Sequence, residues 1–500
     1  MNVIYDLFYG FGVAFQPWNL LACFFGVFIG TLVGVLPGIG PVGTMSLLLP
    51  ITFGISPVTG IIMLAGIFYG AMYGGSTTSI LVNIPGEAAS VVTCLDGYQM
   101  ARQGRAGPAL GIAAFGSFIA GTLSVVGLMI LANPLAALAV KFGPAEFFSL
   151  MCLGLSVLIY LTQGSILRGL IMAGIGLFFS LMGQDIITGK TRFTFGLTGL
   201  IDGIGLVPLV MGFFGISEIL LNLEKLTERT VVKTKVKGLL PNKEDWRRSA
   251  KPIGRGTLLG FILGILPGAG GITATFVSYA LEKKLSKHPE QFGKGAIEGV
   301  AGPESANNAA TGASLIPLFS LGIPANVVAA LLLGALMIHG IRPGPLMLTE
   351  HPEVFWGTVA SMYVGNIMLL VLNLPLIGMW VKVLQIPYKI LFPLILLFCF
   401  IGAYSSGNNV FDLYVMLFCG VLGYLLRKMN YEPAPLVLAY VLGPMLEQNL
   451  RQALILSDGH FGVFLTRPLS AACLIITFFL LVSAALPSLQ KKRRVIAVEE

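Results

Sequence analysis

The chain has 500 residues, of which 55% are hydrophobic and 11% are charged, and its formal net charge at pH 7 is +8. Soluble domains carry about 25% charged residues, so this composition excludes an ordinary soluble globular protein. Of the 31 Lys and Arg residues, 14 lie in two short segments, 223–255 and 491–494, a placement that argues against nucleic-acid binding.

Apolar runs close to the length of a membrane span recur along the chain. A helix needs roughly 20 such residues to cross the hydrocarbon layer, and these runs lack the alternation that marks a transmembrane β-strand. We therefore predict an all-α polytopic membrane protein of about 12 transmembrane helices, some of them re-entrant or broken. The runs are 110–131, 147–161, 167–182, 204–221, 327–338, 359–374, 390–404 and 469–486.

The sequence GVFIGTLVGVLPGIG, residues 26–40, places a Pro-Gly pair inside an apolar run. Glycine recurs every fourth residue from Gly26 to Gly34, which gives a smooth helix face for close packing. Pro37 removes a backbone donor and Gly38 permits positive φ, so we expect the helix to break there. Freed backbone groups in hydrocarbon cost several kcal/mol unless protein or water satisfies them. The break is therefore predicted to line a cavity, with a simple kink as the alternative.

The sequence YGGSTTSILVNIPGEAAS, residues 73–90, gathers small hydroxyl and amide residues before Ile84-Pro85. These side chains are too polar for a lipid-facing helix, and the stretch runs without basic residues into apolar helix. We predict that it faces a membrane-embedded cavity; an exposed loop is the alternative. Glu87 is a candidate acid that could instead lie at an interface. The polar candidates are Ser76, Thr77, Thr78, Ser79 and Asn83.

The segment 223–255 carries ten Lys or Arg residues against four acids and separates two apolar halves, 1–222 and 256–487. A second basic cluster, 491–494, lies in the tail 488–500. Basic loops that flank membrane spans stay in the cytoplasm. We therefore predict a cytoplasmic loop between two transmembrane halves and a cytoplasmic tail after the second half. Contact with lipid headgroups or a partner is the alternative.

The sequence GTLLGFILGILPGAG, residues 256–270, repeats the first interruption 230 positions later, with all five glycines and the Leu-Pro pair in register. We interpret this match as an internal duplication. The amino-terminal end carries only Asp6 as a charge and has no reason to stay inside. If the amino end is external and the segments after both halves are cytoplasmic, the first half crosses the membrane an odd number of times and the second half an even number. The two repeats are then inverted, which is the common plan of secondary transporters.

The sequence GPESANNAATGASLIPLFSLGIPAN, residues 302–326, is the second polar stretch and ends near Ile323-Pro324, 239 positions after Ile84-Pro85. An acid at membrane depth is a functional candidate by default, which singles out Glu304. The other polar residues are Ser305, Asn307, Asn308, Thr311 and Ser314.

A half-helix that starts inside the membrane points unpaired N–H groups and the positive end of its dipole at a ligand. Two such ends could hold a carboxylate without a buried arginine, and unwound carbonyl and hydroxyl oxygens could hold Na⁺. The sequence shows no nucleophile–base pair, metal-ligand spacing or nucleotide motif, so we expect a transporter that is not an enzyme, needs no cofactor and uses an ion gradient. Arg102 or Arg105 contacting the anion is a minority alternative.

The stretches GVLPGIGPVGT, YGGSTTSILVNIPGEAASVVTCLDGYQMARQGRAGPALG and PESANNAATGASLIPLFSLGIP resemble the large membrane subunit of the bacterial tripartite tricarboxylate transporters, the TctA family. The resemblance extends over nearly the whole chain. It implies a permease of the bacterial inner membrane that imports citrate or another organic carboxylate, driven by Na⁺ or H⁺. It also implies two partners, a small four-span membrane subunit (TctB-like) and a periplasmic solute-binding protein (TctC-like). A stand-alone permease or channel is the alternative.

The resemblance also implies the residues that bind substrate or ion. One departure is that Ala325 and Asn326 follow the second Ile-Pro pair, where the family commonly has glycine. The implied residues are Gly38, Gly40, Ser76, Thr77, Thr78, Asn83, Pro85 and Gly86 in the first half, and Gly268, Gly270, Glu304, Asn307, Asn308, Gly322 and Pro324 in the second.

Overall fold

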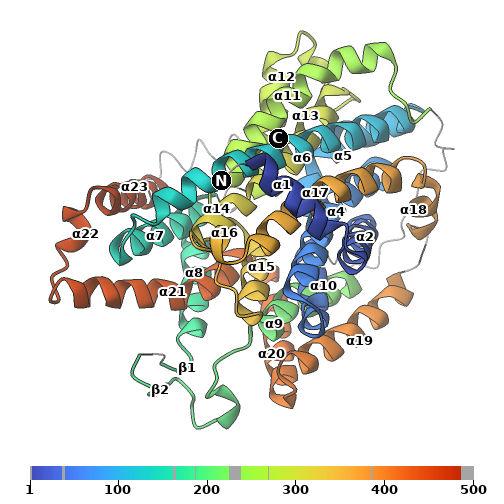
Figure 1. The fold of residues 1–500 in the computed structure, drawn as a ribbon. Helices are drawn as coiled ribbons and strands as arrows, with labels where there is room; N and C mark the ends of the chain where they lie inside the picture. The colour runs from blue at the N-terminus through green and yellow to red at the C-terminus, as the bar shows by residue number, and fades with distance from the viewer. Residues whose placement is uncertain are drawn as a thin grey trace.

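The computed structural model describes residues 3–36, 40–161, 165–185, 187–224, 238–268, 270–384, 386 and 388–485 (Figure 1). The predicted break at Pro37 and Gly38 lies outside these residues, as do 225–237 of the basic segment and the whole tail 488–500.

The first half is a succession of helices with one short hairpin of strands. Its α-helices are α1 (Val3–Ala14), α2 (Pro17–Val35), α3 (Gly40–Leu48), α4 (Pro57–Val82), α5 (Val91–Arg102), α6 (Ala106–Ala139), α7 (Pro144–Leu161), α8 (Ile166–Ser180), α9 (Leu206–Val210) and α10 (Ser217–Glu224). Between them lie the 3-10 helices η1 (Leu49–Gly54), η2 (Ala88–Ser90) and η3 (Thr198–Leu200), the π-helix η4 (Met211–Ile216), and the antiparallel strands β1 (Gly183–Gln184) and β2 (Thr191–Arg192).

The second half is helical throughout its described residues. Its α-helices are α11 (Lys243–Ile265), α12 (Gly270–Leu285), α13 (Glu298–Ala313), α14 (Leu315–Leu321), α15 (Val327–Ile338), α16 (Met347–Glu350), α17 (Pro352–Asn373), α18 (Ile377–Val383), α19 (Tyr388–Gly407), α20 (Val410–Lys428), α21 (Ala434–Leu456), α22 (Val463–Thr466) and α23 (Pro468–Ala485), with the 3-10 helix η5 (Pro289–Gln291) after α12.

Within the described residues, 6 helices are long and apolar enough to cross a membrane. Several shorter apolar helices, such as Val327–Ile338 and Pro468–Ser483, supplement them. This confirms the predicted all-α polytopic class. The long candidates are Pro17–Val35, Pro57–Val82, Ala106–Ala139, Leu206–Glu224, Pro352–Asn373 and Val410–Lys428.

The predicted glycine stripes are packing surfaces. α2 lies against α4, and α11 lies against α13. A Cβ added at Gly30 would lie 2.5 Å from the carbonyl oxygen of Ile67, and one at Gly260 would lie 2.1 Å from that of Ala306. Only glycine lets the two backbones approach so closely. The same pairing occurs once in each half, which supports the internal duplication.

Each interrupted helix folds back as a re-entrant hairpin. In the first half, α3 and η1 return from the interruption to the start of α4, where Thr59 donates a 2.6 Å hydrogen bond to Asn19 of α2. In the second half, α12 folds back along α11, and Arg255 Nε donates to Glu282 Oε1 at 2.7 Å.

The two hairpins start at opposite ends of α4. Thr59, near the start of α4, contacts Asn19 near the start of α2, whereas Ile80, near its end, lies against Gly97 of α5. Arg105, which follows α5, pairs with Asp245 in the first turn of α11 at 2.5 Å, so the second hairpin starts where α5 finishes. His339, which follows α15, lies 3.4 Å from a Cβ placed at Gly60 near the start of α4, so the first hairpin starts where α15 finishes. A pair of inverted repeats requires this arrangement.

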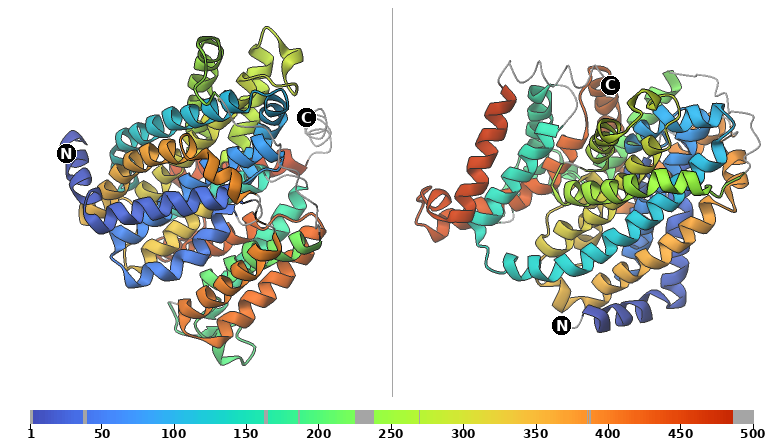
Figure 2. Two further views of the ribbon diagram at one scale, coloured as in Figure 1. Left: turned by 90° about the vertical axis from the view of Figure 1, so that its right-hand side faces the viewer. Right: turned by 90° about the horizontal axis from the view of Figure 1, so that it is seen from above.

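Helices of each half pack against helices of the other half. α6 of the first half packs on α13 of the second, and α17 of the second packs on α4 of the first. Farther along the chain, α8 packs on α21 and α20 packs on η4. As a result, α7, α21 and α23 lie on one side of the molecule, and α19 and α20 lie on another (Figures 1 and 2).

The segment 223–255, predicted as a loop, ends in helix. α11 begins at Lys243, because Asn242 and Asp245 form a reciprocal cap in which Asn242 Oδ1 accepts the N–H of Asp245 at 2.9 Å and Asp245 Oδ2 accepts the N–H of Asn242 at 3.2 Å. This capping box satisfies two backbone donors and fixes the first turn. The basic residues from Lys243 onward therefore lie on a helix.

Candidate functional site

A cavity of about 620 Å³ lies where the two interrupted segments meet. The first segment contributes Gly40 and Pro41 to its wall, and the second contributes Gly268, Gly270 and Gly271. The two interruptions, 230 positions apart in the sequence, therefore border one chamber, as predicted for broken helices at membrane depth.

The backbone at the second interruption is held by the second Ile-Pro segment. Gly268 has φ +85°, and its N–H donates to the carbonyl oxygen of Ala325 at 2.7 Å. A Cβ at Gly268 would lie 2.3 Å from Cα of Leu158 on α7, so both the positive φ and the close approach require glycine.

Four helices start at the wall of this cavity. The lining includes the first residues of α3, of α12 and of α15, and of the turn η2 that leads into α5. The first N–H groups of a helix lack partners inside the helix, and its dipole is positive at that end. Four such ends converging on one chamber make its wall favourable for an anion. The lining residues at these ends are Gly40, Pro41 and Val42; Gly270, Gly271 and Ile272; Val327 and Val328; and Ala88 and Ala89.

Two of these ends carry a capping side chain at equivalent positions of the two repeats. Glu87 Oε2 accepts the N–H of Ala89 at 2.6 Å, and Asn326 Oδ1 accepts the N–H of Ala329 at 2.8 Å. Glu87 and Asn326 are 239 positions apart, the separation of the two Ile-Pro pairs. Of the two residues that follow the second Ile-Pro pair, Ala325 supplies the backbone carbonyl that Gly268 contacts, and Asn326 supplies the side chain that caps α15.

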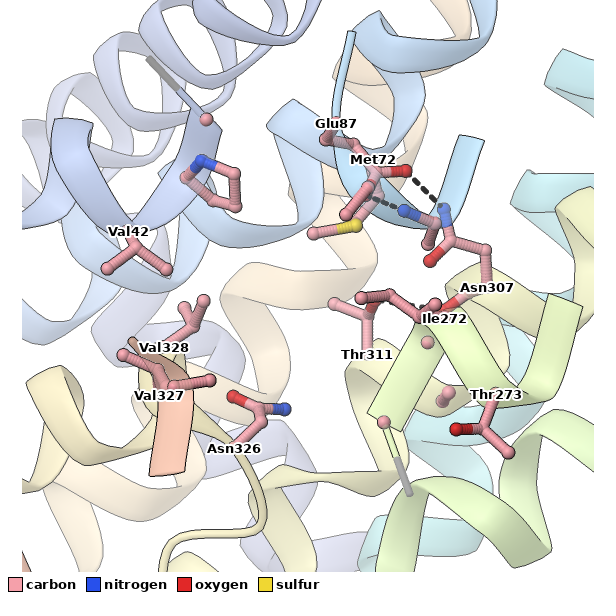
Figure 3. Close-up of a pocket in the computed structure, with 18 of the residues that line it drawn as sticks. Val42, Met72, Glu87, Ile272, Thr273, Asn307, Thr311, Asn326, Val327 and Val328 are labelled. Carbon is pink, nitrogen blue, oxygen red and sulfur yellow. Dashed lines mark hydrogen bonds between the residues drawn. The ribbon is translucent and has the colours of Figure 1, made fainter. Parts of the chain in front are cut away.

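The polar wall of the cavity is built on α13. Asn307 Nδ2 donates to Glu87 Oε1 at 3.1 Å (Figure 3). Thr311 Oγ1 donates to the carbonyl oxygen of Asn307 at 2.9 Å. Asn307 Oδ1 is buried and has no hydrogen-bond partner among the described residues. A buried acceptor without a donor is unfavourable, so this oxygen suits a ligand that brings a donor or a cation.

The opposite wall is apolar. Val42 of α3 and Val327 and Val328 of α15 face the chamber across from Asn307 (Figure 3). Asn326 lies on the same side, below these valines in Figure 3. A polar wall facing an apolar one fits a small organic molecule with charged groups on a carbon skeleton.

One part of the cavity wall carries a paired base and acid. Arg427, near the end of α20, and Glu218, in the first turn of α10, both line the cavity and are joined by a hydrogen bond. Lys428 and Glu224 form a second pair beside them, 2.7 Å apart, where α10 leads toward the basic segment.

The sequence-predicted site residues divide into three groups. Gly40, Pro85, Gly86, Gly268, Gly270 and Asn307 line the cavity. Ser76, Thr77, Thr78, Glu304, Asn308 and Pro324 are buried but do not line it. Asn83 and Gly322 lie at helix ends outside the lining, and Gly38 falls outside the described residues.

Glu304 lies behind the polar wall, where its side chain joins three helices. It is 1% exposed and accepts hydrogen bonds from Ser76 Oγ of α4 at 2.5 Å and from Thr93 Oγ1 of α5. Its neighbour Asn308 donates to Ser117 Oγ of α6 at 2.7 Å. These contacts tie α13 of the second half to helices of the first half.

Asn83, Gly322, Gly86 and Thr78 shape the backbone around the site. Asn83 ends α4 at φ +58° and Gly322 ends α14 at φ +72°, the left-handed conformation that turns the chain into each Ile-Pro segment. A Cβ at Gly86 would lie 1.9 Å from the carbonyl oxygen of Gly34. Thr78 Oγ1 donates to the carbonyl oxygen of Val35 at 2.6 Å and satisfies a group freed where α2 ends.

Charged and amide side chains that the resemblance did not imply also line the cavity: Glu87, Asn326, Glu218, Arg427 and Glu432. Glu87 and Asn326 could have been found from their shared 239-residue separation, whereas Arg427 and Glu218 sit near span ends and carry no such signal. Arg105, the alternative contact for an anion, pairs with Asp245 and does not line the cavity.

A multi-pass helical protein with two interrupted repeats around a central cavity has the architecture of a secondary transporter. The chain belongs to the tripartite tricarboxylate transporter TctA family, whose model matches residues 20–438. Membership makes it a component of a tripartite tricarboxylate transporter and points away from an enzyme.

Two proteins of Agrobacterium vitis are similar to this chain. One, described as an uncharacterised 52.8 kDa protein in the TAR-I ttuC′ 3′ region, is 55% identical over 500 residues and covers 100% of both chains. The other, described as an uncharacterised protein in the TAR-II ttuC′ 3′ region, is 54% identical over 241 residues, which are 48% of this chain and 100% of that protein. No solved structure matches the chain at a significant level.

Proposed function

We propose that this chain is the substrate-translocating subunit of an ion-gradient-driven symporter, with Na⁺ as the coupling ion. It imports a tricarboxylate or another organic acid across the bacterial inner membrane. A periplasmic binding protein delivers the substrate, and a small four-span membrane subunit completes the complex.

The single observation that carries this proposal is the convergence of four helix starts on one cavity. The N–H groups at these starts that Glu87 and Asn326 do not cap offer hydrogen bonds to carboxylate oxygens without a fixed positive charge. Among the described lining residues, Arg427 is the one basic side chain, and it is paired with Glu218. An anion held by backbone dipoles can be released more readily than one held by a buried arginine, because no strong ion pair must be broken.

The cavity also has the size and composition for a small organic acid. Its volume of about 620 Å³ is within the range of small-molecule sites, and Asn307 supplies both an amide and an unpartnered oxygen. The apolar wall formed by Val42, Val327 and Val328 would cover the carbon skeleton.

Uptake is expected to need an ion gradient and all three proteins. The complex would be reconstituted in liposomes and supplied with a panel of radiolabelled di- and tricarboxylates, and uptake would be followed with an inward Na⁺ gradient. Dissipating the gradient with a Na⁺ ionophore should lower uptake to background, because the sequence has no nucleotide motif through which ATP could drive it.

Two controls define the result. Omitting the binding protein, and separately omitting the small subunit, should each abolish uptake. Equal uptake by this chain alone, or uptake that persists after all ion gradients are dissipated, would contradict the proposed symporter.

A further inference from the structure

A second, much smaller cavity lies behind the polar wall, between helices of both halves. Its volume is about 10 Å³, close to the space that one water molecule or small ion occupies. No residue of its lining also lines the large cavity, and five of its eight lining residues carry a polar group. The lining is Tyr73, Ser76, Thr77, Leu110, Ala113, Ala114, Ser117 and Asn373.

Oxygen atoms with spare lone pairs surround this small cavity. Asn373 of α17 is 5% exposed; its Nδ2 donates to the carbonyl oxygen of Leu369, while its Oδ1 is buried and has no partner among the described residues. Ser76 and Ser117 each make one described hydrogen bond, to Glu304 and from Asn308 respectively. A hydroxyl oxygen has two lone pairs, so both serines can accept a further contact.

The charge behind the small cavity is a single carboxylate. Glu304 touches Ser76 and Thr93, and the described residues give it no cationic partner. A buried carboxylate without a counter-charge is costly, and one monovalent cation nearby would offset it. Hard cations prefer oxygen ligands, and no thiol or imidazole lines this cavity.

We infer that the small cavity is a Na⁺ site, with Ser76, Ser117 and Asn373 as oxygen ligands and Glu304 as the charge that balances the ion. This inference rests on the proposed symport and gives its coupling ion a place separate from the substrate.

The position of the site explains how ion and substrate can be linked. Ser76 and Ser117 belong to α4 and α6 of the first half, and Asn373 belongs to α17 of the second. α13 lies between the two cavities, since Asn307 faces the large one while the adjacent Asn308 holds Ser117 of the small one. An ion that fixes these helices would therefore set the wall against which the substrate binds, a coupling that acts in both directions.

Binding of Na⁺ can be measured without transport, by thermal unfolding of the purified full chain in NaCl against choline chloride at constant ionic strength. Stabilisation of the unaltered chain should saturate with Na⁺. Asn373→Ala and, independently, Ser117→Ala should each raise the Na⁺ concentration for half-maximal stabilisation at least about tenfold, because each removes one oxygen ligand. The matched control is Thr358→Val on the same helix α17, whose hydroxyl donates only to the carbonyl oxygen of Val354 at 2.7 Å, and which should leave the Na⁺ response unchanged.

Uptake gives the second readout. In reconstituted complexes, Asn373→Ala and Ser117→Ala should raise the Na⁺ concentration for half-maximal uptake by the same factor, with the substrate KM at saturating Na⁺ unchanged. Variants that retain the unaltered Na⁺ response in both assays would overturn the site while leaving symport intact. If both variants weaken stabilisation by Na⁺ but the complex transports no carboxylate, the Na⁺ site is supported and the proposed function is contradicted. Equal stabilisation by K⁺ would overturn the assignment to Na⁺.

Discussion

Asn307→Ala is expected to lower carboxylate uptake roughly 10- to 150-fold, since a hydrogen bond to a charged group is worth about 1.5–3 kcal/mol. Asn307 Nδ2 donates to Glu87 at 3.1 Å and has a second N–H that can donate to a carboxylate oxygen at the polar wall of the large cavity. The loss should appear in reconstituted vesicles at a normal level of folded protein, because α13 remains packed on α6, α11 and α12 when the one hydrogen bond to Glu87 is lost.

Asn308→Ala is the matched comparison for this variant. The adjacent amide turns away from the large cavity and donates to Ser117 at 2.7 Å, so its removal should change the Na⁺ dependence of uptake more than the substrate KM. If Asn307→Ala transports with normal rate and KM, the polar wall built on α13 has no part in substrate binding.

Replacing a stripe glycine by alanine should prevent most of the protein from folding. In Gly260→Ala the new Cβ would meet the carbonyl oxygen of Ala306 at 2.1 Å, and in Gly34→Ala it would meet that of Ala71 at 2.3 Å. Backbone atoms cannot move aside as a flexible side chain can, so the paired helices must separate, at a cost of about 1–3 kcal/mol or more for each substitution. The yield of monodisperse protein in size-exclusion chromatography, and its unfolding temperature, measure the effect.

Gly254→Ala serves as the control, because Gly254 lies on the same helix as Gly260 and a Cβ there meets no described atom within 4 Å. This variant should match the unaltered chain in yield and unfolding temperature. Normal yield and stability of Gly260→Ala would show that α11 and α13 are farther apart than described here.

The sequence was most informative where one physical requirement admits few residue types. Glycine at every fourth position predicts close helix packing, and Gly30 and Gly260 indeed lie against backbone carbonyls. The repeated Pro-Gly pair predicts interrupted helices, and Gly268 and Gly270 have positive φ. These features fixed the class of fold and the place where the two halves meet.

The orientation of each polar side chain could not be predicted, because it depends on the rotation of a helix within the bundle. Glu304 was expected at the binding site, but it faces α4 and α5 and lies behind the wall. Glu87 was expected nearer an interface, yet it caps η2 and lines the cavity. Both acids are buried, and the packing of α13 against its neighbours determines which one a substrate can reach.

Polar residues that end helices were also open to misinterpretation. Asn83 stands among hydroxyl residues in the sequence, and the structure uses it to end α4 in the left-handed conformation, with its side chain exposed. Asn326, by contrast, follows Ala325, the residue that stands where the family commonly has glycine, and caps α15 at the cavity wall. Sequence alone does not separate an asparagine that turns the chain from one that faces a ligand.

The most direct measurement is a cryo-electron microscopy structure of the complex with the carboxylate that its binding protein selects. The account predicts density for that carboxylate between the starts of α3, α12 and α15, within hydrogen-bonding distance of their first N–H groups and of Asn307. Density for the substrate at any other place, with this chamber filled by lipid or collapsed, would contradict the claim that the two interrupted helices together form the transport site.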